Sequence, residues 1–463
     1  MPRFFLGNFE FEHRLAKPKG QLAAKLDRIN AELATSWLTI ADDGDYLWTP
    51  QPIAARFFED AAVDQLPRVI PVVSLDAVPR GVECQPWGWT DDVRRLCDKH
   101  GWVRNDPPDA AVRAVNSRRL SSALEQEWLV GPEFAGEATS IEQIERFRSF
   151  HDPDTRWVIK AEFGMSGRER LIGSGSPTEA DRNWIAKRLA ADGVVFFEPW
   201  VERLSEVGIQ IDVPLHGEPQ LIGITPMFVN AHGQYSGSEF RSAQAVDTVF
   251  NPAFNDGDSA VEVALRAARR IQDQGYFGPL GIDCMRYRGA DGLIRLRPLQ
   301  DINARWTMGR LSLGLRRLLK SGEFGFWWHG PDLSSEVENR VQILRAYFES
   351  RQMRLTQECE TVARHLFESI EEIDGEESID DELVERILRK IDSTSRRIII
   401  RTAVQIAEAG LFRFTLTTEG RPRHFPSSPT FVRQIQTSPQ SVGGEAATHK
   451  SVVMISRQRS PML

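Results

Sequence analysis

Short apolar runs alternate with helically spaced apolar residues in the first part of the chain. Residues 3–8 and 68–74 are apolar runs between polar segments, a pattern typical of strands. Residues 20–38 carry apolar side chains at helical spacing, and 89–100 contain a threonine cap followed by two acidic residues, which predicts a helix. Strands that alternate with helices predict an α/β domain over 1–115.

Strand patterns continue through the middle of the chain. Strands are predicted over 157–160, 170–173, 193–201, 202–212 and 221–225. A helix is predicted over 259–274, because its apolar residues recur on one side. It leads into two strands joined at Gly289-Ala-Asp-Gly292, since Asp-Gly is a strong short-range reversal signal.

This reversal brings acidic residues together. Asp283 and Asp301 lie nine residues before and nine after Gly292, so the hairpin sets them opposite each other. Alternation along the returning strand puts Asn303 and Arg305 on the same face. Carboxylate and amide oxygens suit Mg²⁺, which takes the rest of its shell from water and substrate phosphates. The pattern indicates a site for a metal-bound nucleotide.

One residue of the returning strand argues against this register. Pro298 cannot donate a ladder hydrogen bond, so it indicates an edge strand or a bulge. A register shift of one residue would separate Asp283 from Asp301. The alternative interpretation is an ordinary hairpin whose charged residues face solvent, and motifs elsewhere decide between the two.

Composition narrows the class of protein. The 463 residues suffice for two to four domains. The net charge of -8 argues against a generally nucleic-acid-binding surface but leaves room for a local basic patch that binds phosphates. The four cysteines have no CxxC spacing and no long apolar segment occurs, which predicts a cytoplasmic protein with reduced thiols and no membrane partner. The absence of GxSxG and HxxxH motifs disfavours serine and zinc hydrolases.

A candidate phosphate-binding loop follows the strand that ends at Lys160. Gly164, Ser166 and Gly167 are small enough for backbone N–H groups to approach an anion, and Lys160 and Arg168 add positive charge. The loop is not a Walker motif, and the alternative is a plain β-hairpin.

Two basic residues open the helix that a serine caps near residue 117. Arg118 or Arg119 is a candidate phosphate contact, although a solvated helix face is the simpler interpretation of such a pair.

The strand over 193–201 stops at a proline and a new strand begins, as in a linker between two lobes. Backbone groups from Pro199 to Val201 are candidates to pair with an adenine edge, with Phe197 and Trp200 as apolar walls. Glu206 is a candidate acceptor for ribose hydroxyls. Otherwise the tryptophan is simply part of the core.

In their order along the chain, these motifs resemble those of the ATP-grasp superfamily over roughly residues 116–315. The matching elements are Arg118 or Arg119, Lys160 with its loop, Glu198-Pro-Trp-Val201 with Glu206, and Asp283 with Asp301-Ile-Asn-Ala-Arg305. Four departures stand out: Asp301 replaces the more common glutamate, an arginine replaces the first lysine, the loop over 164–168 has few glycines, and the final hairpin is longer than usual.

The resemblance implies an α/β (α+β) fold of several parts. A Rossmann-like pre-ATP-grasp domain is expected over 1–115 and an ATP-grasp domain over 116–330, with lobes of about 116–197 and 198–330. A helical C-terminal extension is expected over 331–417 from its apolar spacing, and a Pro-, Ser-, Arg- and Gly-rich tail over 418–463 predicts little fixed structure.

The implied activity is an ATP-dependent carboxylate-amine ligase. ATP would be held by Lys160, Arg118 or Arg119, Ser166, Gly167 and the 198–206 segment, and Mg²⁺, or alternatively Mn²⁺, by Asp283, Asp301 and Asn303. Arg168 and Arg305 would be catalytic. Partners would be a small-molecule carboxylate and an amine, with amino acids or peptides as candidates and no nucleic acid; the sequence gives no oligomeric state. A small-molecule kinase and a non-catalytic nucleotide-binding scaffold are the alternatives.

Overall fold

The structure is a computed structural model, and it describes the chain in segments. The described residues are 2–17, 24–63, 65–164, 169–229, 235–242, 260–289, 291–320, 324–331, 344, 356–369, 372–373, 376–379, 413–414, 432–436 and 449–456. They fall into two compact units, one comprising Met1–Ser236 with Phe250–Leu315 and the other Gly237–Val249 with Arg316–Leu463.

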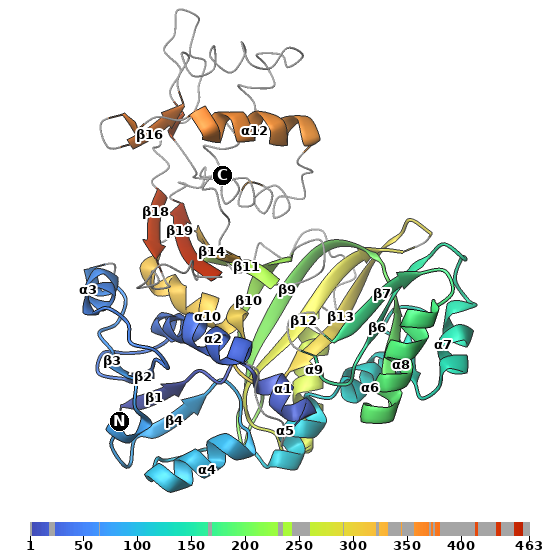
Figure 1. Cartoon of the computed structure of the whole chain (residues 1–463), viewed down its shortest axis with the longest axis horizontal. Helices are drawn as coiled ribbons and strands as arrows, with labels where there is room; N and C mark the ends of the chain where they lie inside the picture. The colour runs from blue at the N-terminus through green and yellow to red at the C-terminus, as the bar shows by residue number, and fades with distance from the viewer. Residues whose placement is uncertain are drawn as a thin grey trace, which may run out of the picture. The chain divides into compact units, whose positions relative to one another are not determined.

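A parallel sheet forms the first part of the first unit (Figure 1). Its strands are β1 (Arg3–Leu6), β2 (Tyr46–Trp48), β3 (Ile70–Val72) and β4 (Glu83–Pro86), in the order β3-β2-β1-β4. This is the order of the first four strands of a Rossmann-type sheet. The α/β character predicted for this segment is confirmed.

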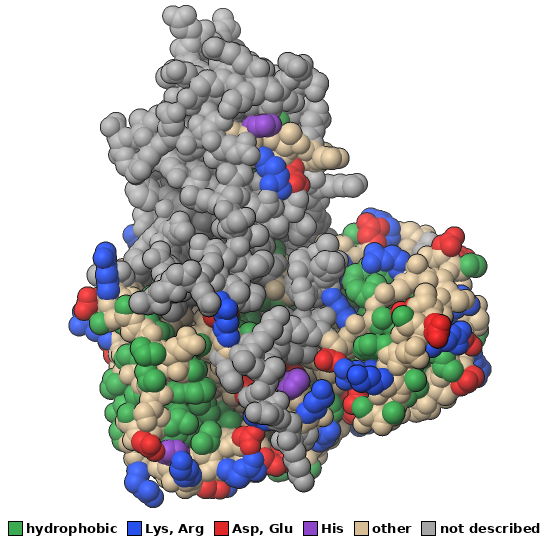
Figure 2. All heavy atoms as spheres, viewed as in Figure 1, with side chains coloured by type: hydrophobic (Ala, Val, Ile, Leu, Met, Phe, Trp, Pro, Cys, Tyr) green, Lys and Arg blue, Asp and Glu red, His purple; other side chains and the backbone are tan. Residues whose placement is uncertain are grey.

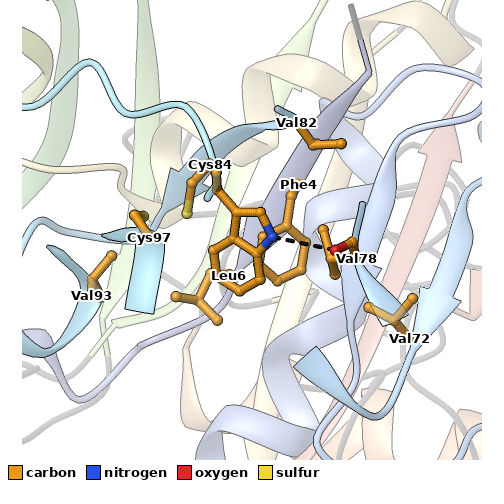
Figure 3. Close-up of a cluster of buried hydrophobic side chains, with 9 residues drawn as sticks. Phe4, Leu6, Val72, Val78, Val82, Cys84, Val93 and Cys97 are labelled. Carbon is orange, nitrogen blue, oxygen red and sulfur yellow. Dashed lines mark hydrogen bonds between the residues drawn. The ribbon is translucent and has the colours of Figure 1, made fainter. Parts of the chain in front are cut away.

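Short helices connect and follow these strands. They are α1 (Phe11–Ala16), α2 (Ala24–Leu33), η1 (Ala34–Thr39), α3 (Ala55–Val63), η2 (Leu75–Ala77), α4 (Asp91–His100) and α5 (Asp109–Val115). The hydroxyl of Thr90 accepts a hydrogen bond from the N–H of Val93, so the threonine caps α4 as predicted. Phe4 and Leu6 of β1 pack against Val93 and Cys97 of α4 in a buried core (Figure 3).

An antiparallel sheet follows, in the order β5-β8-β6-β7. It consists of β5 (Gly136–Ala138), β6 (Arg156–Lys160), β7 (Arg170–Ser174) and β8 (Val195–Pro199), with the helices α6 (Arg118–Trp128), α7 (Ile141–Arg148) and α8 (Glu179–Asp192). Trp157 and Phe197 of the sheet pack against Ile144 of α7 and Ile185 of α8. That core holds one face of the sheet, and alternation sends Lys160 and Glu198 to the other.

A second antiparallel layer contains the predicted hairpin. Its strands in the first unit are β9 (Glu202–Val213), β10 (Gln220–Val229), β12 (Gly278–Arg288) and β13 (Ile294–Asn303), in the order β13-β12-β9-β10. The predicted helix is present as α9 (Ala260–Asp273), which packs against β9 and β13. The helix α10 (Met308–Gly314) and the turn η4 (Leu315–Leu318) follow.

The second unit contains strands from distant parts of the sequence. β11 (Tyr235–Arg241) pairs with β14 (Phe324–Pro331), which pairs with β19 (His449–Ser456), and β19 pairs with β18 (Val432–Gln436), all antiparallel. Its other described elements are α12 (Gln357–Ser369), β15 (Glu372–Ile373), β16 (Glu376–Ile379) and β17 (Arg413–Phe414). The prediction of little fixed structure over 418–463 is wrong for β18 and β19, because β19 forms an antiparallel ladder with β14 on one side and with β18 on the other. Most of the predicted extension lies outside the described residues.

Three further observations concern membrane-spanning helices, the cysteines and the surface charge. In the part of the chain that the structure describes, no helix is long and apolar enough to cross a membrane. The four cysteines are free thiols, and three of them are buried. On the face drawn in Figure 2, basic and acidic side chains of the described residues are interspersed.

Candidate functional site

Asp283 of β12 and Asp301 of β13 lie directly opposite each other in the antiparallel ladder. This is the pairing predicted by counting residues on either side of Gly292, and it is confirmed. Both side chains are half-buried. Directly paired residues on adjacent strands have Cβ atoms roughly 5 Å apart, so the two carboxylates share one small region of the sheet.

The predicted irregularity near Pro298 is also present. The ladder changes register between Asp283 and Met285, and Met285 pairs with Arg297, so Cys284 faces the three residues that begin with Pro298. From one ladder pair to the next, β12 advances by two residues while β13 advances by four, so the register is offset by two residues rather than one. An even offset leaves each side chain on its original face, so the carboxylates stay together.

Asn303 and Arg305 extend the same face, as predicted. Asn303 donates from Nδ2 to Oδ2 of Asp283 at 3.3 Å and accepts at Oδ1 from Nη2 of Arg305 at 3.0 Å. Arg305 also forms an ion pair with Glu12 of α1, and its guanidinium carbon lies 5.2 Å from the ring centroid of Trp87. The parallel-sheet part of the unit therefore contributes to this site.

Neighbouring carboxylates and burial change the pKa of Asp283. Burial and the neighbouring carboxylates of Asp301 and Glu206 raise its pKa to about 7, although Arg305 and the amide of Asn303 act in the opposite direction. A cation between the two aspartates would relieve this repulsion. The donors, two carboxylates and one amide that can turn its oxygen inward, are hard oxygen ligands and fit Mg²⁺. Among the described residues, no cluster of three or more His, Cys, Asp or Glu side chains offers a metal site.

Arg118 reaches this site from the start of α6. The hydroxyl of Ser117 accepts a hydrogen bond from the N–H of Arg119 and caps the helix, as predicted. The Arg118 guanidinium then donates from Nη1 to Oδ1 of Asp301 at 3.2 Å and from Nη2 to Oδ2 at 3.1 Å. A bidentate pair of this kind fixes both distance and orientation.

Arg119 has a different surrounding. Its guanidinium pairs with Glu137 of β5 and with Glu162, the latter at 3.5 Å. Successive residues of an α-helix point about 100° apart, so only one of two adjacent arginines can face a given site. The structure thus brings Arg118, but not Arg119, to the two aspartates.

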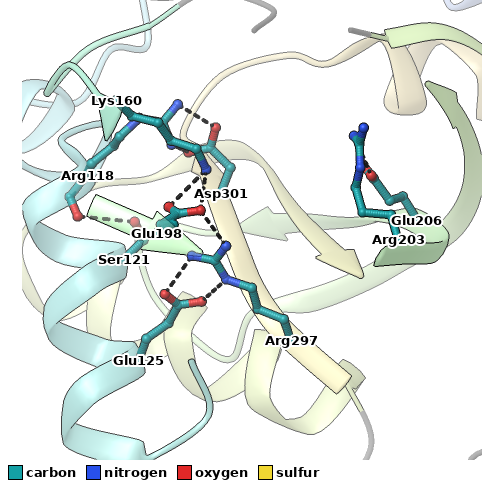
Figure 4. A network of polar contacts seen from close by, with 9 residues as sticks. All are labelled: Arg118, Ser121, Glu125, Lys160, Glu198, Arg203, Glu206, Arg297 and Asp301. Carbon is teal, nitrogen blue, oxygen red and sulfur yellow. Dashed lines mark hydrogen bonds and ion pairs between the residues drawn. The ribbon is translucent and has the colours of Figure 1, made fainter. Parts of the chain in front are cut away.

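Lys160 ends β6 and points toward β8. Its Nζ lies 2.9 Å from Oε1 and 2.7 Å from Oε2 of Glu198 (Figure 4). Burial lowers the pKa of Lys160, and the Glu198 carboxylate opposes that shift. Burial acts to raise the pKa of Glu198, but Arg297 and Lys160 outweigh it and hold that pKa well below its usual value. The two groups form a largely buried ion pair.

Two residues of this region were not predicted from the sequence. Arg297 of β13 binds Glu198 and also Glu125 of α6, and it is only 4% exposed. No local motif marks either residue, since Glu125 and Arg297 are 172 positions apart. The one signal in the sequence was Arg297 itself, because side-chain alternation places this arginine at a buried position of β13 and a buried charge needs a partner.

The segment between the lobes places its predicted residues near arginines. The guanidinium carbons of Arg156 and Arg203 each lie 5.1 Å from the ring centroid of Trp200. Arg203 also pairs with the buried Glu206 at 3.1 Å, and Val201 is half-buried. The contacts predicted for these residues with adenine and ribose remain predictions.

Three residues assigned to the phosphate loop, Ser166, Gly167 and Arg168, lie outside the described residues. The strands on either side are described, and β6 and β7 pair from Arg156 opposite Ser174 to Lys160 opposite Arg170. The two predicted strands are therefore present, and they pair antiparallel.

Two cavities lie among the described residues of the first unit. One of about 440 Å³ lies beside α6, and Glu125, Glu198 and Arg297 are among its lining residues. Another of about 440 Å³ is lined by Asn8 and Thr90, which follow β1 and β4. Ligands of open α/β sheets bind beyond the carboxyl ends of the strands, where the strand order reverses.

No protein-family model and no curated protein sequence matches the chain. Among solved structures, biotin carboxylase from Campylobacter jejuni is 11% identical, with 73% of this chain and 77% of that chain covered and a TM-score of 0.43. N5-carboxyaminoimidazole synthetase from Staphylococcus aureus with ADP is 10% identical, with 77% and 91% covered and a TM-score of 0.40. A putative ATP-grasp superfamily protein from Archaeoglobus fulgidus is 12% identical, with 72% and 95% covered and a TM-score of 0.37. Because these TM-scores are below 0.5, the function proposed next rests on the side chains of the site.

Proposed function

We propose that this chain is an ATP-grasp enzyme of the carboxylate-amine ligase type, which uses Mg-ATP to activate a carboxylate and join it to an amine. The observation that carries the proposal is the pairing of Asp283 with Asp301 next to Asn303, with Arg118 within hydrogen-bonding distance. A two-carboxylate, one-amide donor set beside a guanidinium suits a metal-bound triphosphate.

Asp283, Asp301 and Asn303 would hold the Mg²⁺, or Mn²⁺ in its place. The metal would supply charge neutralisation for the phosphate oxygens. Holding it requires two changes in the chain: Arg118 must release Asp301, and the Asn303 amide must turn its oxygen from Arg305 toward the ion.

The nucleotide phosphates would lie between Lys160 and Arg118. Phosphoryl transfer needs positioning and charge neutralisation more than covalent chemistry, and these two cations come from the first lobe while the acids come from the second. Trp200, Val201 and Glu206 are proposed to hold the base and ribose, and Ser166, Gly167 and Arg168 to cover the phosphates.

In the proposed reaction, an oxygen of the substrate carboxylate bonds to the γ-phosphorus and the bond to ADP breaks, which gives an acyl phosphate. The amine nitrogen then bonds to the acyl carbon, phosphate leaves, and the nitrogen loses a proton. Arg305 is proposed to orient the carboxylate, because its guanidinium bridges Asn303 and Glu12. The cavity beyond β1 and β4 is proposed to receive one substrate.

The test measures ATP binding by calorimetry and phosphate release with libraries of acids and amines, amino acids and peptides included. The variants Lys160→Met and Asp301→Asn should each weaken Mg-ATP binding about tenfold or more. Arg119→Met is the matched control, since it removes a neighbouring cation of α6 that does not face the aspartates. ATP binding that survives both test variants unchanged would rule out this site.

A nucleotide-binding protein without turnover is the second candidate. The observation that favours it is that Asp301 and Arg305 already have protein partners, Arg118 and Glu12. ATP binding with no phosphate release from any substrate mixture would support it. Phosphate that stays on the product instead of being released would identify a small-molecule kinase.

A further inference from the structure

Arg297 connects two elements that are distant in sequence. Its Nε and Nη2 donate to Oε1 and Oε2 of Glu125 on α6 at 2.6 and 2.9 Å, and its Nη1 donates to Oε2 of Glu198 on β8 at 2.8 Å (Figure 4). The guanidinium thus uses both edges of its fork, and each edge meets a carboxylate from a different element.

The resulting chain of charges alternates in sign. Lys160 contacts Glu198, Glu198 contacts Arg297, and Arg297 contacts Glu125, which makes two cations and two anions. Glu125, Glu198 and Arg297 are 6%, 9% and 4% exposed, so none of them is neutralised mainly by water. Removal of one member of a buried ionic group leaves an uncompensated charge and is usually costly.

Glu198 is held from two sides by this chain. Its Oε2 accepts from Nζ of Lys160 at 2.7 Å and from Nη1 of Arg297 at 2.8 Å, and its Oε1 accepts from Lys160 at 2.9 Å. Rotation of the carboxylate away from Lys160 would therefore break the contact with Arg297 as well. The position of the ammonium group depends on a residue that it does not touch.

We propose that Arg297, supported by Glu125, is a positioning residue that keeps the Glu198 carboxylate against Lys160 and so fixes the ammonium where it meets a nucleotide phosphate. The inference rests on the proposed function for the role of Lys160 in nucleotide binding. The geometric half, that Arg297 determines the surroundings of Lys160, stands independently of any nucleotide.

A purely structural role is the competing explanation, in which the Glu125 and Arg297 pair only fastens α6 to β13. The double variant Glu125→Arg with Arg297→Glu separates the two. It restores opposite charges between α6 and β13, but it places a second carboxylate against Glu198. If the pair only fastens α6 to β13, the double variant should recover wild-type Lys160 labelling and Mg-ATP affinity. If Arg297 positions Glu198, neither property should recover.

Three measurements test the proposal on the full-length protein: the thermal midpoint, Mg-ATP affinity by calorimetry, and the rate at which acetic anhydride labels Lys160, mapped by mass spectrometry. In Arg297→Met and in the swapped variant, we expect Lys160 labelling to rise severalfold and Mg-ATP affinity to fall about tenfold. The swapped variant should regain part of the thermal midpoint that Arg297→Met loses.

Arg3→Met is the control for lost stability alone, because Arg3 forms a half-buried ion pair with Asp45 in the parallel-sheet part. It should lower the thermal midpoint and leave both labelling and affinity unchanged. Swapped protein with wild-type labelling and wild-type affinity would overturn the proposal. If wild-type protein fails to bind Mg-ATP while Arg297→Met still increases labelling, the proposed function fails and the positioning of Lys160 stands.

Discussion

Arg118 on α6 forms a bidentate ion pair with Asp301 on β13, with donor to acceptor distances of 3.2 and 3.1 Å. Asp301 is one of the two carboxylates proposed to bind metal. The Arg118 guanidinium and a metal ion would therefore compete for the Asp301 carboxylate. Mg²⁺ with its nucleotide would have to displace Arg118, and the freed guanidinium would gain the phosphates as a new partner. Metal and nucleotide binding are therefore expected to be coupled through this one side chain.

The substitution Arg118→Met should change metal and nucleotide binding in opposite directions. Without nucleotide, Mn²⁺ affinity should rise about fivefold, because a competing cation worth roughly 1 kcal/mol is removed. With metal present, ATP affinity should fall about tenfold, since a phosphate contact is lost. Electron paramagnetic resonance of Mn²⁺ and calorimetry with Mg-ATP measure the two effects.

Arg119→Met again serves as control and should leave both affinities within twofold of the wild type. A loss of Mn²⁺ affinity in Arg118→Met would show that Arg118 supports the metal site rather than competes with it.

Stability should depend on pH through Asp283. Its pKa is raised to about 7 from the usual aspartate value of 3.8, so ionisation is more costly in the folded chain than in the unfolded chain. This cost grows as pH rises from about 4 through about 7 and is complete above it, which means that Asp283 lowers stability most under alkaline conditions. In metal-free protein, Asp283→Asn should therefore raise the thermal midpoint, by about 5 °C at pH 8 and by less at pH 5.

Added Mg²⁺ should narrow this difference between wild type and Asp283→Asn, because only the wild type keeps both carboxylates for the ion. A difference in thermal midpoint that is constant from pH 5 to pH 8 would show that Asp283 titrates as an ordinary aspartate.

The aspartate pair was predictable because it depends on local rules. The Asp-Gly turn fixes the centre of the hairpin, and side-chain alternation then assigns Asp283, Asp301, Asn303 and Arg305 to one face. Pro298 signalled an irregular ladder, and the sequence could not say whether the offset would be one residue or two. Next to the turn the ladder is centred on Asp291, since Arg288 pairs with Ile294. The offset of two then brings Asp283 opposite Asp301 without changing the face of either side chain.

The ionic chain behind Lys160 was not predictable from local rules. It needs α6 to lie beside β13, and this contact joins Glu125 to a residue 172 positions later. The sequence left Arg118 and Arg119 as alternatives for a related reason, since helical periodicity says that their side chains diverge but not which one faces the aspartates. Tertiary packing decides both questions.

Close packing in the first lobe predicts a sharp stability effect at Gly173. A Cβ at this position of β7 would collide with the indole ring of Trp157, which is 1% exposed and donates from Nε1 to the backbone oxygen of Gly175 at 2.9 Å. Gly173→Ala should therefore lower stability by about 1–3 kcal/mol through overpacking. Denaturant unfolding measures it, and Gly193→Ala is an unsuitable control because its φ of 72° is itself left-handed.

Ser174→Ala, at the exposed next position of β7, is the better comparison and should change stability by less than about 0.5 kcal/mol. Equal stability of Gly173→Ala and Ser174→Ala would mean that the Trp157 ring can shift without loss.

Glu12 of the parallel-sheet part should affect turnover rather than nucleotide binding. It is 7% exposed and pairs with Arg305, whose other partner is Asn303, so it holds the guanidinium proposed to orient the substrate carboxylate. With Glu12→Gln, the charge that anchors Arg305 is lost while the hydrogen-bonding shape is kept, and we expect kcat to fall about tenfold with Mg-ATP affinity unchanged. Phosphate release and calorimetry measure the two quantities. An equal loss in both would show that Arg305 acts on the metal site through Asn303, to which it donates a hydrogen bond, rather than on the substrate carboxylate alone.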